Sequence, residues 1–298
     1  MNASIPSTCF DVQGPDGVLR AESWGPADAP VIVLVHGYPD NRSEWREVAE
    51  QLADQYRVVA YDVRGAGDSF KPTGRPAYRL DRLMADFKAV IDKVSPDRPV
   101  HLVGHDWGSV QSWEFATEPA LKGRIASYVS CSGPCLDHMG FWIRDRLRRP
   151  TPWHLYQFTI QMLKSWYVYM FQLPWWPEAQ WRWFIGRHWP ALVRLTEGTV
   201  ITPRPTQVSD GTHGVWLYRA NVFQRVFSPR ERYAQAPVLV LVATKDNFVS
   251  PWLSEDLSRW VPQLERREIK AAHWVNVADA VGFAQHVRAF IGRLGKPQ

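Results

Sequence analysis

The chain has 298 residues, of which 45% are hydrophobic and 22% charged, and it carries a formal net charge of +5 at pH 7. These values are ordinary for a folded globular protein and exclude the core-poor composition of a disordered chain. Arginines cluster only at residues 144–149, which we interpret as a solvated charged face, so we expect no nucleic acid as a partner. No uninterrupted apolar run reaches the roughly 20 residues that span a bilayer.

Cysteine usage and the start of the chain favour a cytoplasmic location. The three cysteines, Cys9, Cys131 and Cys135, are odd in number, and no Cys/His set has the spacing of metal ligands. We therefore expect reduced thiols and no bound metal. Residues 1–5 have neither the charged region nor the apolar core of a signal peptide.

The first half of the chain alternates short β-branched runs with helical patterns. We expect strands at 9–12, 18–24, 31–35, 57–62, 100–103 and 125–130, and helices at 43–52 (with Ser43 as N-cap), 80–94 and about 107–117. The turn at residues 14–17 predicts a hairpin between the first two strands. The wholly apolar run at 31–35 is typical of a strand buried on both faces of a parallel sheet.

The alternation stops near residue 133. Residues 133–230 are rich in Trp, Tyr, Arg and Pro and show helical spacing. Alternation resumes with a strand at 238–242, a helix at 251–260, a strand at 266–270 and a final helix at 279–293. This order predicts a doubly wound, mostly parallel α/β sheet with a helical cap inserted after the sixth strand. We place the core at residues 1–133 and 231–298 and the cap at 134–230.

The segment Gly104-His105-Asp106-Trp107-Gly108 directly follows the strand at 100–103. Its spacing is that of a nucleophile elbow, in which a strand turns sharply into a helix and glycines avoid Cβ clashes. Aspartate carboxylates, with a reference pKa of about 3.9, are ionised at neutral pH and need no base to become nucleophiles. An aspartate that displaces at an sp³ carbon forms an alkyl ester, which water can open. The elbow therefore predicts Asp106 as a nucleophile.

The loop His36-Gly37-Tyr38-Pro39 follows the strand at 31–35. In a mechanism that passes through an acyl ester, the backbone N–H of Tyr38 can form one half of an oxyanion hole. The N–H of Trp107, the residue after the nucleophile, can form the other half. We expect His36 and His105 to shape the loops around this site.

A general base is predicted at His273, which follows the late strand at 266–270 and comes after the elbow in the sequence. Asp246, after the strand that begins at 238, is the acid that we expect to orient the imidazole ring. Asp137, shortly after the strand that ends near residue 130, is the competing acid.

The chain order of nucleophile, acid and base is that of α/β-hydrolases. Together with the segments 61–69 and 105–109, it makes the chain resemble the α/β-hydrolase superfamily over nearly its whole length. Within that superfamily it is similar to the branch of epoxide hydrolases and haloalkane dehalogenases. The resemblance implies a small lipophilic substrate, water as co-substrate, no cofactor, and a monomer or homodimer.

The leaving group separates the two activities of this branch. An epoxide oxygen leaves as an alkoxide and needs a positioned acid, whereas a halide needs only N–H donors. Dehalogenases of this branch typically place an Asn after His-Gly or a second Trp in the cap, and here Tyr38 stands after His-Gly. The segments 166–172 and 217–221 resemble the two tyrosine motifs of epoxide hydrolases, which implies Tyr167 and Tyr218 as the acids. Tyr169 is a rival for the first position.

We therefore expect an epoxide hydrolase that converts a lipophilic epoxide to a vicinal diol. A haloalkane dehalogenase is the first alternative. The second is another esterase or lactone hydrolase of this fold, or a non-catalytic binding protein.

Seven of the 16 tryptophans lie between Trp153 and Trp189. The wall of a dry pocket and the packing of the cap on the core explain this concentration equally well. Contact with a membrane surface is the explanation that we favour least.

Overall fold

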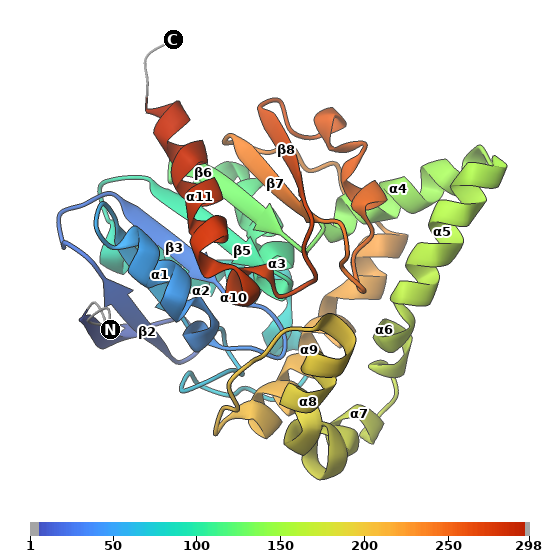
Figure 1. The fold of residues 1–298 in the computed structure, drawn as a ribbon, viewed down its shortest axis with the longest axis horizontal. Helices are drawn as coiled ribbons and strands as arrows, with labels where there is room; N and C mark the ends of the chain where they lie inside the picture. Colours follow the sequence, from blue (N-terminus) through green and yellow to red (C-terminus); the bar gives the residue numbers. More distant parts are fainter. Residues whose placement is uncertain (1–5, 296–298) are drawn as a thin grey trace.

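The computed structural model describes residues 6–295, which form an eight-stranded sheet in the order β1-β2-β4-β3-β5-β6-β7-β8 (Figure 1). The strands are β1 (Ser7–Gln13), β2 (Val18–Trp24), β3 (Val31–Val35), β4 (Arg57–Tyr61), β5 (Val100–His105), β6 (Ile125–Cys131), β7 (Val238–Ala243) and β8 (Leu264–Ile269). β1 and β2 form the predicted hairpin, and β2 pairs antiparallel with β4. All other pairings are parallel, which confirms the predicted fold class. The prediction that no signal peptide is present rests on residues 1–5, which lie outside the described range.

Helices cover both faces of the sheet and form the cap. They are α1 (Arg46–Leu52), α2 (Leu80–Val94), α3 (Trp107–Ala116), α4 (Leu136–Arg148), α5 (Pro152–Lys164), α6 (Trp166–Met170), α7 (Trp176–Gln180), α8 (Gly186–Glu197), α9 (Gln207–Phe227), α10 (Val275–Ala278) and α11 (Ala280–Leu294). A π-helical turn, Trp181–Ile185, joins α7 to α8.

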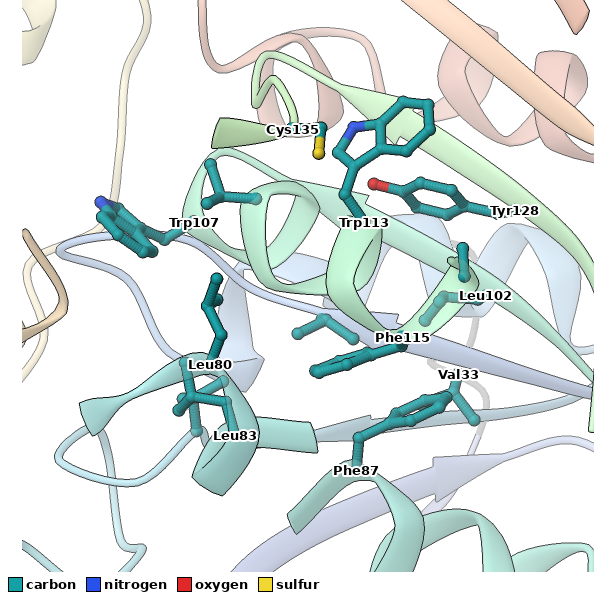
Figure 2. Packing of buried hydrophobic residues seen from close by; sticks show 14 of the residues in the cluster. Val33, Leu80, Leu83, Phe87, Leu102, Trp107, Trp113, Phe115, Tyr128 and Cys135 are labelled. Atoms are coloured by element: carbon teal, nitrogen blue, oxygen red, sulfur yellow. The ribbon is translucent and has the colours of Figure 1, made fainter. Parts of the chain in front are cut away.

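Two apolar layers hold the helices against the sheet. On one face, Trp45 lies just before α1 and packs on Phe283 of α11, with ring centroids 5.7 Å apart. On the other face, Phe87 of α2 packs against Phe115 of α3 (Figure 2), and their ring centroids are 4.5 Å apart. β3 lies between the two layers, so its apolar side chains are buried on both sides, as the sequence predicts.

Two local predictions are wrong. Asn41, and not Ser43, caps the helical turn before α1, because its Oδ1 atom accepts from the N–H of Ser43 at 3.1 Å. The expected helix at 251–260 consists of two short 3₁₀ turns, Pro251–Ser254 and Leu257–Arg259. The chain leaves helical geometry between them, where the Asp256 carboxylate pairs with Arg146 of the cap.

The helices α4 to α9 lie between β6 and β7 in the sequence and stand beside the sheet as a group (Figure 1). Polar side chains of α9 attach this group to core loops. Asp210 accepts from the N–H of Gly67 at 2.9 Å, and Asn221 accepts from the N–H of Leu80 at 3.0 Å. The boundaries that we assign to core and cap stay a prediction.

Candidate active site

The structure places Asp106 at a sharp turn between β5 and α3. Its φ of 49° lies in the left-handed region, which residues with a Cβ rarely adopt. A Cβ at Gly104 would lie 2.6 Å from the carbonyl oxygen of Gly108, and one at Gly108 would lie 1.9 Å from that of Val35. Both glycines are therefore needed for this turn, which has the geometry of a nucleophile elbow.

The structure brings Asp106, His273 and Asp246 together. His273 Nε2 lies 3.5 Å from Asp106 Oδ2, and His273 Nδ1 lies 2.9 Å from Asp246 Oδ2. The other oxygen of Asp246 accepts from the backbone N–H groups of Phe248 and Val249, at 2.7 and 3.0 Å. The imidazole thus has one nitrogen fixed by a buried carboxylate and the other directed at the elbow.

Asp137, the competing acid, is held elsewhere. Its Oδ2 atom lies 2.7 Å from an Nη atom of Arg230, and its Oδ1 atom accepts from the backbone N–H of the same arginine. This pairing is a structural link between α4 and the segment after α9.

The electrostatic environment of the triad favours a protonated His273 beside an ionised Asp246 in the free protein. Burial alone would lower the pKa of His273, but the negative charges of Asp246 and Asp106 outweigh it and raise that pKa well above its usual value. Burial would raise the pKa of Asp246, but His273 and two backbone N–H donors lower it instead. Asp246 is therefore ionised across the neutral range.

The loop after β3 reaches the nucleophile. The N–H of Tyr38 donates to Asp106 Oδ1 at 2.6 Å, and a Cβ at Gly37 would lie 2.5 Å from that same oxygen. Trp107 is the first residue of α3, where backbone N–H groups have no acceptor within the helix. His36 accepts from the N–H of Val63 at 2.9 Å, so it ties this loop to the segment after β4. The carbonyl of Pro39, at the end of the loop, accepts from Gln207 of the cap at 3.2 Å.

The two predicted cap tyrosines lie opposite the elbow. Tyr167 of α6 and Tyr218 of α9 have ring centroids 5.8 Å apart, and the Tyr218 ring lies 4.9 Å from that of Trp107. Burial, and then the nearby negative charge of Asp106, raise the pKa of Tyr167. Burial, Tyr167 and Asp106 raise the pKa of Tyr218. Both phenols are therefore protonated and able to donate.

Tyr169, the rival position, is about half exposed, and its hydroxyl donates to the sulfur of Met162 at 3.4 Å. Its ring packs on Phe223, with centroids 5.7 Å apart.

Two apolar cavities meet at Asp106, Tyr167 and Tyr218. The first, of about 390 Å³, runs between α4, α5 and α9 and is lined by residues such as Ile143, Phe158 and Val226. The second, of about 850 Å³, runs between α5, α6 and α8 and is lined by residues such as Leu163, Trp189 and Leu192. The elbow thus lies at the junction of two apolar arms.

One carboxylate of the cap was not predicted from the sequence. Glu197, the last residue of α8, accepts from the backbone N–H of His273 at 2.8 Å and from the side chain of Asn247 at 2.7 Å. It thereby contacts both loops that carry the triad partners. Glu197 belongs to no sequence motif. It is one of only two acidic residues between positions 146 and 209, and this rarity marks it in the sequence as a candidate for a specific role.

Two further acidic residues near the site, Asp40 and Glu44, also escaped prediction. Asp40, which directly follows the loop motif, accepts from the indole N–H of Trp274 at 2.8 Å. Glu44 lies 3.5 Å from His105 Nδ1, and His105 Nε2 lies 3.0 Å from the carbonyl oxygen of His273. Burial and the charge of Asp40 raise the pKa of Glu44 to about 7. For Asp40 the signal is its place directly after Pro39 of the loop motif, whereas Glu44 adjoins no motif residue.

A family model described as alpha/beta hydrolase fold matches residues 30–280. The chain belongs to the α/β-hydrolase family. Among relatives of this α/β-hydrolase, the Mycobacterium tuberculosis protein named oxidoreductase EphD is 37% identical over 273 residues, which cover 88% of this chain and 46% of that protein. The chain thus spans about half the length of this relative. Human epoxide hydrolase 4 is 28% identical over 291 residues, which cover 91% of this chain and 75% of the human one.

Solved structures show the same fold. A mutant epoxide hydrolase from Bacillus megaterium, in complex with a naphthyloxy-propanediol product, matches with a TM-score of 0.78 at 19% identity, covering 95% of this chain and 100% of that one. An epoxide hydrolase from Vigna radiata matches with a TM-score of 0.72 at 22% identity, covering 98% and 99% of the two chains.

Proposed function

We propose that this α/β-hydrolase converts lipophilic epoxides to vicinal diols through a covalent ester on Asp106. The observation that carries the proposal is the position of two protonated phenols, Tyr167 and Tyr218, across the same cavity junction from an aspartate elbow. A carboxylate nucleophile with opposing acids suits the opening of a strained ether. Relatives named epoxide hydrolases support the same reading.

In the first step, Asp106 Oδ2 attacks one epoxide carbon, and the bond from that carbon to the ring oxygen breaks. Tyr167 and Tyr218 donate hydrogen bonds to the leaving oxygen, and one of them transfers its proton and is reprotonated from solvent. The Oδ1 atom becomes the carbonyl oxygen of the ester, because it already accepts from the N–H of Tyr38. The step yields a β-hydroxyalkyl ester.

Once the charge of Asp106 is lost in the ester, the His273 imidazolium releases its proton to solvent. In the second step, the neutral His273 removes a proton from water, and the resulting hydroxide attacks the ester carbon. The backbone N–H groups of Tyr38 and Trp107 stabilise the oxyanion that forms. Asp246 stabilises the imidazolium, which then returns its proton to the departing alkoxide. The diol leaves, and the carboxylic acid formed on Asp106 passes its proton to His273, which restores the carboxylate beside the imidazolium.

The shape of the cavities suggests the substrate class. Both arms are lined mainly by apolar side chains, and the reacting groups lie where the arms meet. An epoxide within a longer apolar molecule places one apolar substituent in each arm.

The proposal is tested by comparing an internal aliphatic epoxide with a bromoalkane of matched length. We expect diol from the epoxide, no bromide from the bromoalkane, and no product from either with Asp106→Ala. Release of bromide at a comparable rate would overturn the epoxide assignment in favour of dehalogenation. Diol formation that survives Asp106→Ala would overturn the covalent mechanism.

A further inference from the structure

The outer surface of the cap exposes an unusual number of large apolar side chains. Of the seven tryptophans between residues 153 and 189, five are between 38% and 78% exposed: Trp153, Trp166, Trp175, Trp176 and Trp183. Packing and pocket lining together account for Trp181, which is buried, and Trp189, which is partly buried. Trp153 packs on Trp252 of the core, with ring centroids 5.5 Å apart. Neither explanation covers Trp175 and Trp183. Folded monomers rarely leave such large apolar patches in contact with water.

We use "cap face" for the exposed apolar side chains of Leu163, Trp166, Leu173, Trp175, Trp176, Trp183, Phe184 and Leu195. They come from the end of α5, from α6, from the segment between α6 and α7, from α7, and from the π-turn and α8, which lie away from the sheet in Figure 1. Leu163, Trp166 and Trp176 also line the larger cavity. The mouth of that cavity therefore opens on the cap face.

The charge around the cap face has one sign. Between residues 146 and 209 the only acidic residues are Glu178 and Glu197. Glu178 pairs with Arg219, and Glu197 is buried against the triad loops. The exposed charged residues of this stretch are all arginines. Arg182, Arg187 and Arg194 lie in the π-turn and α8 with the cap face, whereas Arg148 and Arg149 lie where α4 ends, at the other end of α5. A surface that combines exposed tryptophans with arginines and lacks exposed carboxylates is complementary to anionic headgroups above an acyl layer.

We propose that the cap face binds the surface of an anionic lipid bilayer. Tryptophans prefer the boundary between headgroups and acyl chains, where the ring is apolar and the indole N–H is hydrated. The arginines contact phosphate groups beside them. Among the helices of residues 6–295, none has the length and hydropathy of a membrane-spanning segment.

This contact would place the mouth of the larger cavity against the bilayer. Lipophilic molecules dissolved in the acyl layer would then reach the junction at Asp106 without crossing water. The binding itself does not rest on the proposed chemistry, and it can be tested at cap residues that line neither cavity, such as Trp175, Trp183 and Arg182.

Co-sedimentation with vesicles tests the proposal. We expect the protein to bind mixed phosphatidylcholine and phosphatidylglycerol vesicles, to bind pure phosphatidylcholine vesicles more weakly, and to be released from the mixed vesicles by high salt. The double variants Trp175→Ser/Trp183→Ser and Arg182→Glu/Arg187→Glu should each weaken the partition by about tenfold or more. Turnover of a short, water-soluble epoxide should be unchanged in both.

Matched control variants distinguish binding through the cap face from nonspecific adsorption to vesicles. Val18→Ser/Val281→Ser removes exposed apolar side chains, and Lys122→Glu/Lys270→Glu reverses exposed charges, at positions outside the cap. These variants should bind like the wild type. Equal losses in controls and cap variants, or no binding of wild type to anionic vesicles, would overturn the proposal. The proposal would also be overturned if the wild type bound no vesicles but self-associated, and if the tryptophan variants abolished that self-association. The cap face would then be an interface between copies of the chain.

Discussion

The Nε2 atom of His273 lies 3.5 Å from Oδ2 of Asp106, so the imidazole is in direct electrostatic contact with the carboxylate that would be esterified. The negative charge of Asp106 contributes to the raised pKa of His273. Ester formation removes that charge, and the pKa of the ring then falls. His273 would therefore become a competent base in the intermediate, when a water must be activated.

We predict that Asp106→Ala lowers the pKa of His273. The substitution removes one of the two negative charges that raise this pKa and leaves the contact with Asp246 in place. Titration of the imidazole by NMR measures the change, with the exposed Asp81→Asn as a variant that should leave the pKa unaltered. An unchanged or higher pKa in Asp106→Ala would contradict the coupling.

The same coupling predicts how stability depends on pH. The folded-state pKa of His273 is raised, so its protonation contributes fully to stability below the unfolded value of about 6.5. That contribution is lost as the pH rises through the folded-state pKa. The difference in unfolding free energy between wild type and Asp106→Ala should therefore shrink at high pH. Urea denaturation at a series of pH values measures it, and a difference that grows with pH would be inconsistent with this ion pair.

Removing either cap phenol should slow ring opening. We expect Tyr167→Phe and Tyr218→Phe each to reduce the rate of ester formation by roughly 100-fold or more, because the leaving oxygen loses a proton donor. Tyr169→Phe is the matched control and should retain near wild-type rates, since this residue is about half exposed and packs on Phe223. Rapid-quench measurements of the first turnover give these rates. A large loss in Tyr169→Phe with none in Tyr167→Phe would assign the first acid to Tyr169.

Filling either of the two apolar arms with a larger side chain should slow the turnover of long epoxides but not of short ones. Ile143 lines only the smaller arm and Leu192 only the larger one. Ile143→Trp and Leu192→Trp should each lower kcat/KM for a long internal epoxide by about 10- to 200-fold, while a short terminal epoxide keeps its value. Equal losses for both substrates would show that the two arms do not hold separate substituents.

Glu197 should act as a positioning residue for the second step. Loss of its contacts with His273 and Asn247 would let the base move, and a displacement near 1 Å can cost about 100-fold in rate. We expect Glu197→Ala to slow ester hydrolysis while ester formation stays within a few-fold, so that the ester accumulates in the steady state. Glu197→Gln keeps one oxygen acceptor, so its rate of ester hydrolysis should lie between those of the wild type and Glu197→Ala. If ester formation and hydrolysis fell together, Glu197 would hold the whole cap rather than the base.

The sequence predicts the core well because its signals are local. β2 and β3 and the helix α2 begin and end at the predicted residues, since apolar runs and helical periodicity mark them directly. The elbow at Asp106 is equally local, because the two glycines that permit the turn lie within the same five residues. His273 and Asp246 were found by their place after late strands, which a parallel sheet brings to one edge.

Features that depend on contacts between distant segments were not predictable in the same way. The helical pattern at 251–260 gives no sign that Asp256 pairs with Arg146, more than 100 residues away. Glu197 reaches His273 only because α8 folds back over the triad loops. The cap tryptophans carry no periodicity that separates the buried Trp181 from the exposed Trp183.

The most direct test of the account is the intact mass of His273→Gln after exposure to an internal epoxide. We predict that the mass of His273→Gln rises by that of one substrate molecule, and that peptide mapping places the added mass on Asp106. The same experiment with His273→Gln/Asp106→Ala should show no addition. Absence of an adduct while His273→Gln is still folded, or an adduct on another residue, would contradict the covalent mechanism at Asp106.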